Sequence, residues 1–303
     1  MTDLLIHRAA AHTFVEQLLD QSRAAGLQVD DWIIDHFCFR VTTWDEYRQL
    51  TQYVQTSESD LSGRLLSEAE INGRVITTIR LAQPLQVRNK LIEALEIPGP
   101  KEGTYYPVGF EHIEVLDTTS LESSSFNVPA GTIKFHPLPL SATIEIENRP
   151  LLHGWLLRTR LREVLAPWHP LLSGSIPLGV DVDGSALDIL LGADDIDLAA
   201  GIIGESLAQH QIVNNVQWTQ GRFHEDPCLV TRIESGSIPV QLILSAVYPL
   251  STDSHSHFLT HYKMLVEQGE PLRDAVKQLK AEGLTTVEAF TQKMSKTGHL
   301  ILR

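Results

Sequence analysis

The residues best suited to chemistry are two histidines and a glutamate on three strand-like segments. "DHFCFRV" carries His36, "FEHIEVL" carries His112, and Glu96 lies near the end of a third segment, "LIEALEI". Because side chains alternate along a strand, each histidine shares a face with polar neighbours. Two imidazoles and a carboxylate form a set that can hold a divalent metal ion with open positions for a substrate. The same spacing also fits histidines held by hydrogen bonds and a glutamate that ends a strand.

Further polar side chains share these strand faces. Glu114 and His136 have the residue types of proton carriers, and we take them as candidate catalytic residues. Three cations are candidates for binding an anionic substrate in the same place: Arg40, Arg80 and Lys134. For each cation, the alternative is a solvated or ion-paired position on a strand face.

A second stretch with the residue types of an active site is "SGSIPLGVDVDGSALDILL", residues 173–191. Gly174 and Ser175 form a turn of the kind that holds phosphates, and Asp188 lies on the strand that follows. We take these three as candidate cofactor-binding residues. Phosphoryl transfer at such a site needs paired carboxylates for Mg²⁺, but the position two residues before Asp188 is Ala186. A single carboxylate on this strand is a poor site for Mg²⁺.

Another histidine pair, His257 and His261, has the i, i+4 spacing that can hold a metal ion on a helix. No third ligand is evident nearby in the sequence. The pair is therefore interpreted first as histidines of a helix that hold no metal ion.

The hydrophobic pattern predicts a β-rich first half. A helix over 3–25 is followed by the strand "DHFCFRV" and by a helix that Thr43 caps, with Glu46 three residues on. Further strands are expected at "GRLLSEAEI", "RVITTIRL", "LIEALEI", "FEHIEVL", "TIKFHP" and "ATIEIE", with "SLESSSFNVPAG" as a polar linker.

The pattern changes near residue 150. One helix is expected at "LLHGWLLRTRLREVLA" and another at "DDIDLAAGIIGESLAQHQ", with strands at "WTQGRFHEDPCLVTRIE" and "IPVQLILSAVY". From residue 255 to the end of the sequence, the periodicity predicts helices.

Composition limits the class of protein. The chain has 303 residues, 43% hydrophobic and 20% charged, which is typical of a globular protein with room for two cores. The net charge of −14 argues against binding to nucleic acid or an acidic membrane, and no apolar run approaches the ~20 residues of a membrane span. The N-terminus is not typical of a signal peptide, and two distant cysteines favour a reducing compartment. We expect a cytoplasmic protein whose partner is a small-molecule ligand.

Segments spread over most of residues 30–138 resemble the YecM family: "DHFCFR", "LLSEAEINGRVITTIRL", "IEALEIPGP", "YYPVGFEHIEV" and "TIKFHP". The resemblance implies the vicinal-oxygen-chelate fold of glyoxalases, in which strands of paired βαβββ modules supply the metal ligands. It places ligands on His36, Glu96 and His112. "TIKFHP" offers no carboxylate for the last ligand, and residues 117–131 are too few for a complete second module, which we expect to be truncated.

Residues 165–292 resemble a family with a nucleotidyltransferase-like fold, through the stretch 173–191 and the tail "HFLTHYKMLVEQGEPLRDAVKQLKAEGLTTVEAF". The resemblance implies an aspartate two residues before Asp188 and a glutamate near Gln241, and this chain has neither. Two of the three metal-binding acids that the resemblance implies are absent.

Together these features predict an α+β protein of two domains. Residues 1–150 are expected to form a YecM-like, glyoxalase-like domain, and residues 151–303 a nucleotidyltransferase-like α/β domain that ends in helices. The function expected first is a domain that binds a divalent metal ion and acts on or binds a small oxygen-rich metabolite. The alternatives are a non-catalytic binding or sensor scaffold built from two degenerate enzyme folds and, last, an active nucleotidyltransferase.

Overall fold

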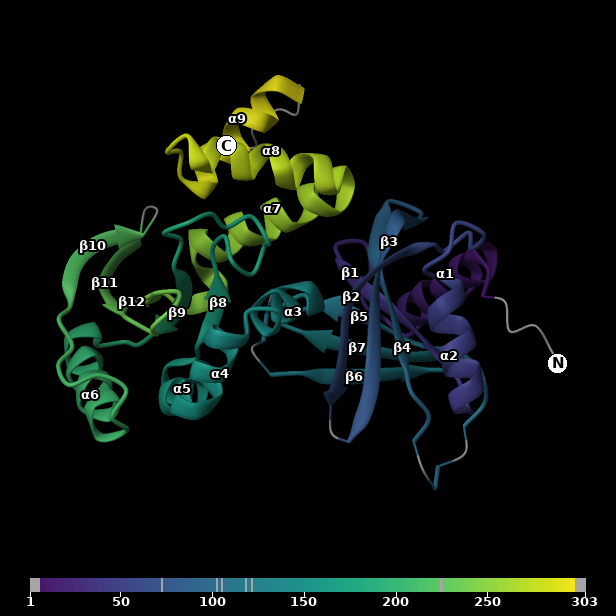
Figure 1. Cartoon of the computed structure of the whole chain (residues 1–303), viewed down its shortest axis with the longest axis horizontal. Helices are drawn as coiled ribbons and strands as arrows, with labels where there is room; N and C mark the ends of the chain where they lie inside the picture. The colour runs from purple at the N-terminus through teal and green to yellow at the C-terminus, as the bar shows by residue number, and fades with distance from the viewer. Residues whose placement is uncertain are drawn as a thin grey trace. The chain divides into compact units, whose positions relative to one another are not determined.

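The structure of the protein is a computed structural model in which the chain divides into two compact units, Met1–Leu140 and Ser141–Arg303 (Figure 1). Each unit buries its own cluster of hydrophobic side chains. The residues that the structure describes are 6–71, 73–101, 103–104, 106–117, 119–120, 122–223 and 226–297.

The first unit is built on a seven-stranded mixed sheet with the strand order β2-β3-β4-β1-β5-β7-β6. Strand β1 lies at its centre, parallel to β4 and antiparallel to β5, and β5 runs parallel to β7. The elements in chain order are α1 (Arg8–Ala24), β1 (Ile34–Arg40), α2 (Trp44–Tyr53), β2 (Gly63–Ile71), β3 (Arg74–Val87), β4 (Lys90–Pro98), β5 (Gly109–Leu116), β6 (Ser124–Val128) and β7 (Gly131–His136).

One face of this sheet is apolar and packs against the helices. Leu18 of α1 and Leu50 of α2 join Phe37 and Ile113 of the strands in one buried cluster. The predicted capping box at the start of α2 is present, because the Thr43 hydroxyl accepts a hydrogen bond from the Glu46 N–H and the Glu46 carboxylate accepts one from the Thr43 N–H. Alternation turns the neighbours of the apolar strand residues, which are mostly polar, to the other face.

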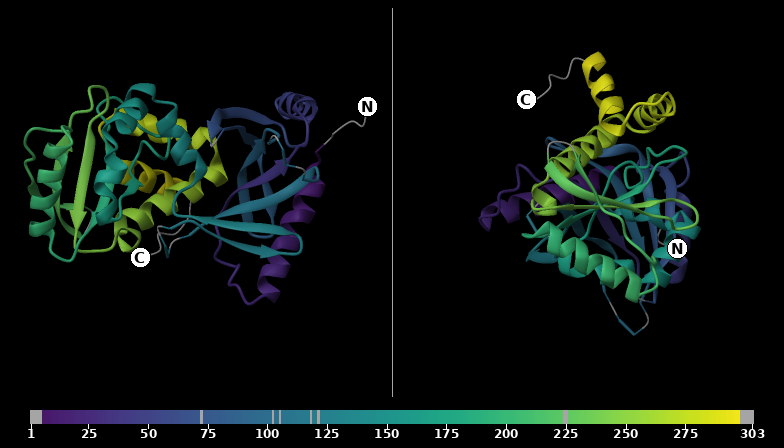
Figure 2. Two further views of the ribbon diagram at one scale, coloured as in Figure 1. Left: turned by 90° about the horizontal axis from the view of Figure 1, so that it is seen from below. Right: turned by 90° about the vertical axis from the view of Figure 1, so that its left-hand side faces the viewer.

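The second unit has a five-stranded mixed sheet with the order β10-β11-β12-β9-β8, in which only β12 and β9 are parallel among the described pairs. Figure 2 shows helix α6 on one side of this sheet and the yellow C-terminal helices on the other. The elements are α3 (Leu140–Glu147), α4 (Pro150–Thr159), α5 (Leu161–Leu165), β8 (Leu171–Ser173), β9 (Leu187–Gly192), α6 (Ile196–Gln209), β10 (Thr219–Phe223), β11 (Asp226–Ile233), β12 (Val240–Ser245), α7 (Asp253–Gln268), α8 (Glu270–Ala281) and α9 (Thr286–Thr297).

The predicted strand "ATIEIE" is wrong, because these residues belong to helix α3. The segment alternates, but Ala142 and Ile146 are also four residues apart, and the helix buries both. A short apolar run cannot be assigned from periodicity alone. Packing against the rest of the second unit determines that this segment is a helix.

Two further predictions need correction. Part of the expected polar linker forms β6, whose hydrogen bonds to β7 hold a segment of low hydrophobicity in the sheet. The single helix expected over 151–166 is broken at Arg160, which has a left-handed backbone (φ 51°) between α4 and α5. The expected first helix begins at Arg8, and residues 3–5 of that prediction lie outside the described residues.

The mixed composition of helices and sheets confirms the α+β class. Among the described residues, no helix is both long and apolar enough to cross a lipid bilayer.

Candidate functional site

Four neighbouring strands place the predicted ligands in two adjacent rows on the polar face of the first sheet. In one row, Glu96 of β4 and His112 of β5 flank the same residue of the central strand. In the next row, His36 of β1 pairs with Glu114 of β5, which pairs in turn with Lys134 of β7. Register partners project from the same face of a sheet, so these side chains meet there.

The side chains of His36, His112, Glu96 and Glu114 converge. The His36 Nε2 atom lies 3.7 Å from a carboxylate oxygen of Glu96 and 3.7 Å from one of Glu114. The His112 Nε2 atom lies 3.9 Å from Glu96 and 3.9 Å from Glu114. Ligand atoms of His36, His112 and Glu114 lie within 4.8 Å of one another, a grouping that can hold a metal ion. The structure thus brings together the three predicted ligands and adds Glu114 to them.

A β-bulge places Asp35 behind His36. The register between β1 and β5 shifts between Ile34 and His36, so that Asp35 is an additional residue on β1. A bulge re-aims side chains relative to strict alternation. The Asp35 carboxylate lies 2.8 Å from His36 Nδ1 and accepts a hydrogen bond of 3.0 Å from the backbone N–H of Leu140. Asp35 therefore orients the imidazole with its Nε2 atom toward the cluster.

A second bulge gives His112 the same arrangement. The register shifts between Cys38 and Phe39, and Glu111 is the additional residue, this time on β5. The Glu111 carboxylate lies 3.1 Å from His112 Nδ1 and forms an ion pair with the guanidinium of Arg40. The His112 Nε2 atom is thereby left to face the cluster.

Sequence reasoning missed both of these carboxylates. Strict alternation puts Asp35 and Glu111 on the face opposite their histidines. The available signal was that an acid directly precedes each histidine, in the pairs Asp35-His36 and Glu111-His112.

The carboxylates around His36 stabilise the protonated, positively charged form of its imidazole. His36 is fully buried, and desolvation by itself would lower its pKa. The carboxylates of Glu114, Asp35 and Glu96 outweigh desolvation and raise the pKa of His36 to about 9. The carboxylates around His36 therefore concentrate negative charge at this buried point.

The environment of His112 is different. Its pKa is lowered, first by burial and then by the positive charge of Lys134, against the opposing hydrogen bond to Glu111. The Lys134 ammonium lies 3.0 Å from His112 Nε2, so a neutral imidazole accepts a hydrogen bond from it. The Lys134 ammonium therefore lies beside the Nε2 atom of His112, which is the nitrogen that would coordinate a metal ion.

The candidate proton carriers lie at the open edge of the cluster. The His136 Nε2 atom is 3.6 Å from a carboxylate oxygen of Glu114, and the Lys134 ammonium is also 3.6 Å from it. The side chains of His136 and Lys134 are 34% and 36% exposed, which leaves them accessible to a ligand from solvent.

The two candidate arginines have different surroundings. Arg40 is partly exposed, pairs with Glu111 and lies 4.6 Å above the ring of Tyr106. Arg80 is buried, and its Nε atom lies 3.7 Å from the carboxylate of buried Glu93. Arg40 is thus the arginine placed to meet a ligand, while Arg80 is engaged inside the unit.

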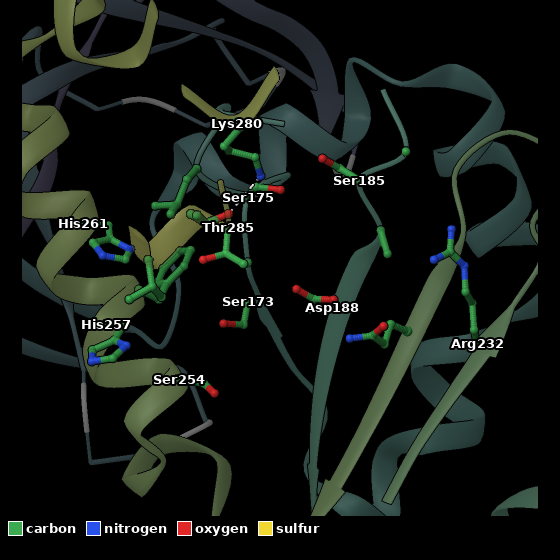
Figure 3. A pocket seen from close by; sticks show the side chains of 18 residues that line it. Ser173, Ser175, Ser185, Asp188, Arg232, Ser254, His257, His261, Lys280 and Thr285 are labelled. Carbon is green, nitrogen blue, oxygen red and sulfur yellow. Dashed lines mark hydrogen bonds between the residues drawn. The ribbon is translucent and has the colours of Figure 1, made fainter. Parts of the chain in front are cut away.

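The second predicted site lies in the second unit, around a cavity of about 480 Å³ (Figure 3). Gly174, Ser175 and Asp188 all line it, as do Ala186 and Gln241. Gly174 has a φ of +84°, and a Cβ atom there would lie 2.3 Å from an Asp188 oxygen. Glycine fits this position for two reasons: its backbone adopts the positive φ of the turn, and its lack of a Cβ atom leaves space for the Asp188 carboxylate.

The helix histidines also face this cavity. The rings of His257 and His261 lie 6.0 Å apart, and the ring of His261 stacks on Phe290 at 4.0 Å. In the described part of the chain, neither belongs to a group of three side chains that could hold a metal ion.

Comparison with known families supports the two predicted resemblances at the level of sequence. Residues 6–129 match the YecM protein family, and residues 155–299 match a domain of unknown function, DUF4269. The protein YecM of Escherichia coli is 33% identical over 106 residues, which are 34% of this chain and 52% of that protein. An uncharacterized protein of Haemophilus influenzae is 27% identical over 141 residues, which are 46% of this chain and 71% of that protein. The chain thus spans about half the length of protein YecM.

Similarity to solved structures is weaker. A structural-genomics protein, EC4020, gives a TM-score of 0.32 at 17% identity and covers 77% of this chain and 82% of its own. The Cid1 poly(U) polymerase bound to Mg 3′-dATP gives a TM-score of 0.32 at 14% identity, over 46% of this chain and 41% of its own. Scores this low carry no argument about the fold or the reaction.

Proposed function

We propose that the polar face of the first unit is a divalent metal centre that binds and acts on a small oxygen-rich metabolite. The observation that carries this proposal is the Nε2 atom of His36. It is fully buried and has no hydrogen-bond partner among the described residues. A buried polar atom left in this state costs about 1–3 kcal/mol, and a metal ion would satisfy it.

The donor set fits a divalent ion. Two imidazole nitrogens and the carboxylates of Glu96 and Glu114 are ligands that zinc and neighbouring transition metals accept. Bonds of about 2.0–2.2 Å require ligand atoms about 3–3.5 Å apart. The histidine-to-carboxylate separations of 3.7–3.9 Å, within a group whose ligand atoms lie within 4.8 Å of one another, would have to contract when an ion binds. Asp35 and Glu111 complete the arrangement, because each holds the Nδ1 side of one ligating histidine.

The surrounding residues favour a small metal-chelated carboxylate or keto acid as the substrate. When bound, a divalent ion would act as a Lewis acid that polarises two neighbouring oxygens of the substrate. Lys134 and Arg40 would hold the negative charge of a carboxylate or keto acid. Arg80 lies in the same row of the sheet as His36, with Ala94 between them, and would stay paired with Glu93. His136 would move the proton, since it stands beside Glu114 without belonging to the ligand set.

The arrangement of the first unit supports a glyoxalase-like assignment. The order β1, α2, β2, β3, β4 is a complete βαβββ module, and β5, β6 and β7 follow without a helix between them among the described residues. This agrees with a truncated second module in a domain of about residues 1–150. For about 151–303 we keep the nucleotidyltransferase-like assignment as a proposal. Active transfer is not proposed, because Ala186 and Gln241 leave Asp188 as the only carboxylate among the described residues of its cavity.

Elemental analysis and calorimetry of the full-length protein test the metal centre. The natural protein should bind one divalent ion, and His36→Ala and His112→Ala should each abolish the site. The matched control is His12→Ala, which removes a partly exposed histidine of α1. Equal metal content in all four proteins would refute the centre.

Oxalate is a suitable probe of bidentate oxygen binding. Its affinity should appear only in the metal-loaded protein and should fall in Lys134→Met. If the protein binds metal and oxalate but turns over no 2-oxo or 2-hydroxy acid, the non-catalytic sensor is the better description. The acidic net charge of −14 supports a small molecule rather than nucleic acid as the partner in either case.

A further inference from the structure

The cavity of the second unit lies between a sheet face and a helix. Ser173, Asp188, Gln241 and Arg232 are register partners in one row across β8, β9, β12 and β11. Figure 3 shows Ser254, His257 and His261 of α7 on one side of the cavity and Asp188 and Arg232 on the other. Its volume of about 480 Å³ is in the range of sites for small metabolites.

The lining of this cavity is cationic and rich in hydroxyls. Arg232 and Lys280 are the basic side chains of the lining, and Asp188 is the one carboxylate that faces them among the described lining residues. Outside the lining, Arg232 also forms an ion pair of 3.6 Å with Glu234. Gln241, His257 and His261 also line the cavity, and the Thr285 hydroxyl donates a hydrogen bond to Glu288. The hydroxyls of the lining are those of Ser173, Ser175, Ser185, Ser254, Thr285 and Thr286. In a protein with a net charge of −14, such a lining selects for an anion.

The charged groups of the cavity do not neutralise one another. Lys280 donates a hydrogen bond of 2.8 Å to the Thr286 hydroxyl, and within the described residues it forms no ion pair. Burial lowers the pKa of Lys280 in spite of Asp181 and Asp188, and burial raises the pKa of Asp188 to about 7 in spite of Lys280 and Arg232. An ion pair would shift both values the opposite way. Lys280 and Asp188 are thus both desolvated, and among the described residues no ion pair joins them.

We infer that this cavity binds a small phosphomonoester directly, without a divalent cation. The Lys280 ammonium and the surrounding hydroxyls supply donors for the three terminal oxygens of a phosphate group. Asp188 accepts a hydrogen bond from a hydroxyl of the rest of the ligand. A bridging Mg²⁺ would need further carboxylates, and the described residues contain no group of three metal ligands in this cavity.

Calorimetry of the full-length protein in the presence of EDTA tests the proposal, with ribose 5-phosphate, glycerol 3-phosphate and inorganic phosphate as probes and malonate as a dicarboxylate of similar charge. At least one phosphate compound should bind, and malonate should not. Lys280→Met should weaken that binding by at least tenfold. Lys277→Met is the matched control, because this exposed lysine lies on the same helix outside the cavity.

Several results would overturn the proposal. These are no binding of any phosphate probe, equal affinity for malonate, a requirement for Mg²⁺, or equal weakening in both lysine variants. If Lys280→Met does not fold, the binding of ribose 5-phosphate is measured instead from its ³¹P spectra. The spectrum with the natural protein is then compared with the spectrum with Arg232→Met. EDTA strips metal from the first unit, so this outcome is independent of the proposed metal centre.

Discussion

Asp35 offers the sharpest test of how the metal centre is built, because it contacts a histidine and is not itself a proposed ligand. Its carboxylate lies 2.8 Å from His36 Nδ1 and also accepts the N–H of Leu140 at 3.0 Å. Asp35→Asn keeps the size of the side chain but replaces a charged acceptor with a neutral amide. Loss of such an outer partner weakens metal binding by about 10- to 100-fold, or roughly 1.4–2.8 kcal/mol.

The assay is a calorimetric titration of the metal-free, full-length protein with Zn²⁺ and, separately, Mn²⁺. We expect His36→Ala to abolish binding, Asp35→Asn to weaken it within the stated range, and the exposed control Asp31→Asn to match the natural protein. Affinity of Asp35→Asn within twofold of the natural protein would refute the orienting role. A loss in Asp35→Asn as complete as that in His36→Ala would show that Asp35 is itself a ligand.

Three further predictions concern the second unit. Because burial raises the pKa of Asp188 to about 7, the folded protein keeps this proton while the unfolded chain releases it near pH 4, and stability falls as the pH rises between these values. Asp188→Asn should flatten the Tm profile from pH 5 to pH 8, and an unchanged slope would contradict the reasoning. Burial lowers the pKa of His255 to about 4, so stability falls as the pH drops below about 6.5, by about 2 kcal/mol at pH 5. The Tm of His255→Phe relative to the natural protein should therefore be higher at pH 5 than at pH 8, and equal differences would count against it. The double change Ala186→Asp with Gln241→Glu should create a Mg²⁺ site that calorimetry detects and that the natural protein lacks; a double variant that binds no Mg²⁺ would refute the interpretation of this cavity as the remnant of a metal site.

Local rules of the chain were enough to find most of the side chains that converge on the polar face of the first sheet. Alternation along "DHFCFRV" and "FEHIEVL" puts His36 and His112 on polar strand faces, and the start of α2 follows directly from Thr43 and Glu46. These features depend only on neighbours two to four residues away. For the same reason Gly174 could be recognised as a turn residue before its φ of +84° was known.

The tertiary structure decided which strands are neighbours and in what register. Pairing of β1 with β5 brings Glu114 opposite His36, so that a residue suggested by the sequence only as a proton carrier becomes a candidate ligand. The two bulges in that pairing turn Asp35 and Glu111 toward the histidines beside them, against strict alternation.

The sequence by itself therefore determined the residue types, the strand faces and the turn that carry the candidate chemistry, because these follow from short-range backbone geometry. It did not determine the helix α3, the added strand β6 or the carboxylate behind each histidine. Those depend on packing and on hydrogen bonds between segments far apart in the chain, and such contacts override weak local preference.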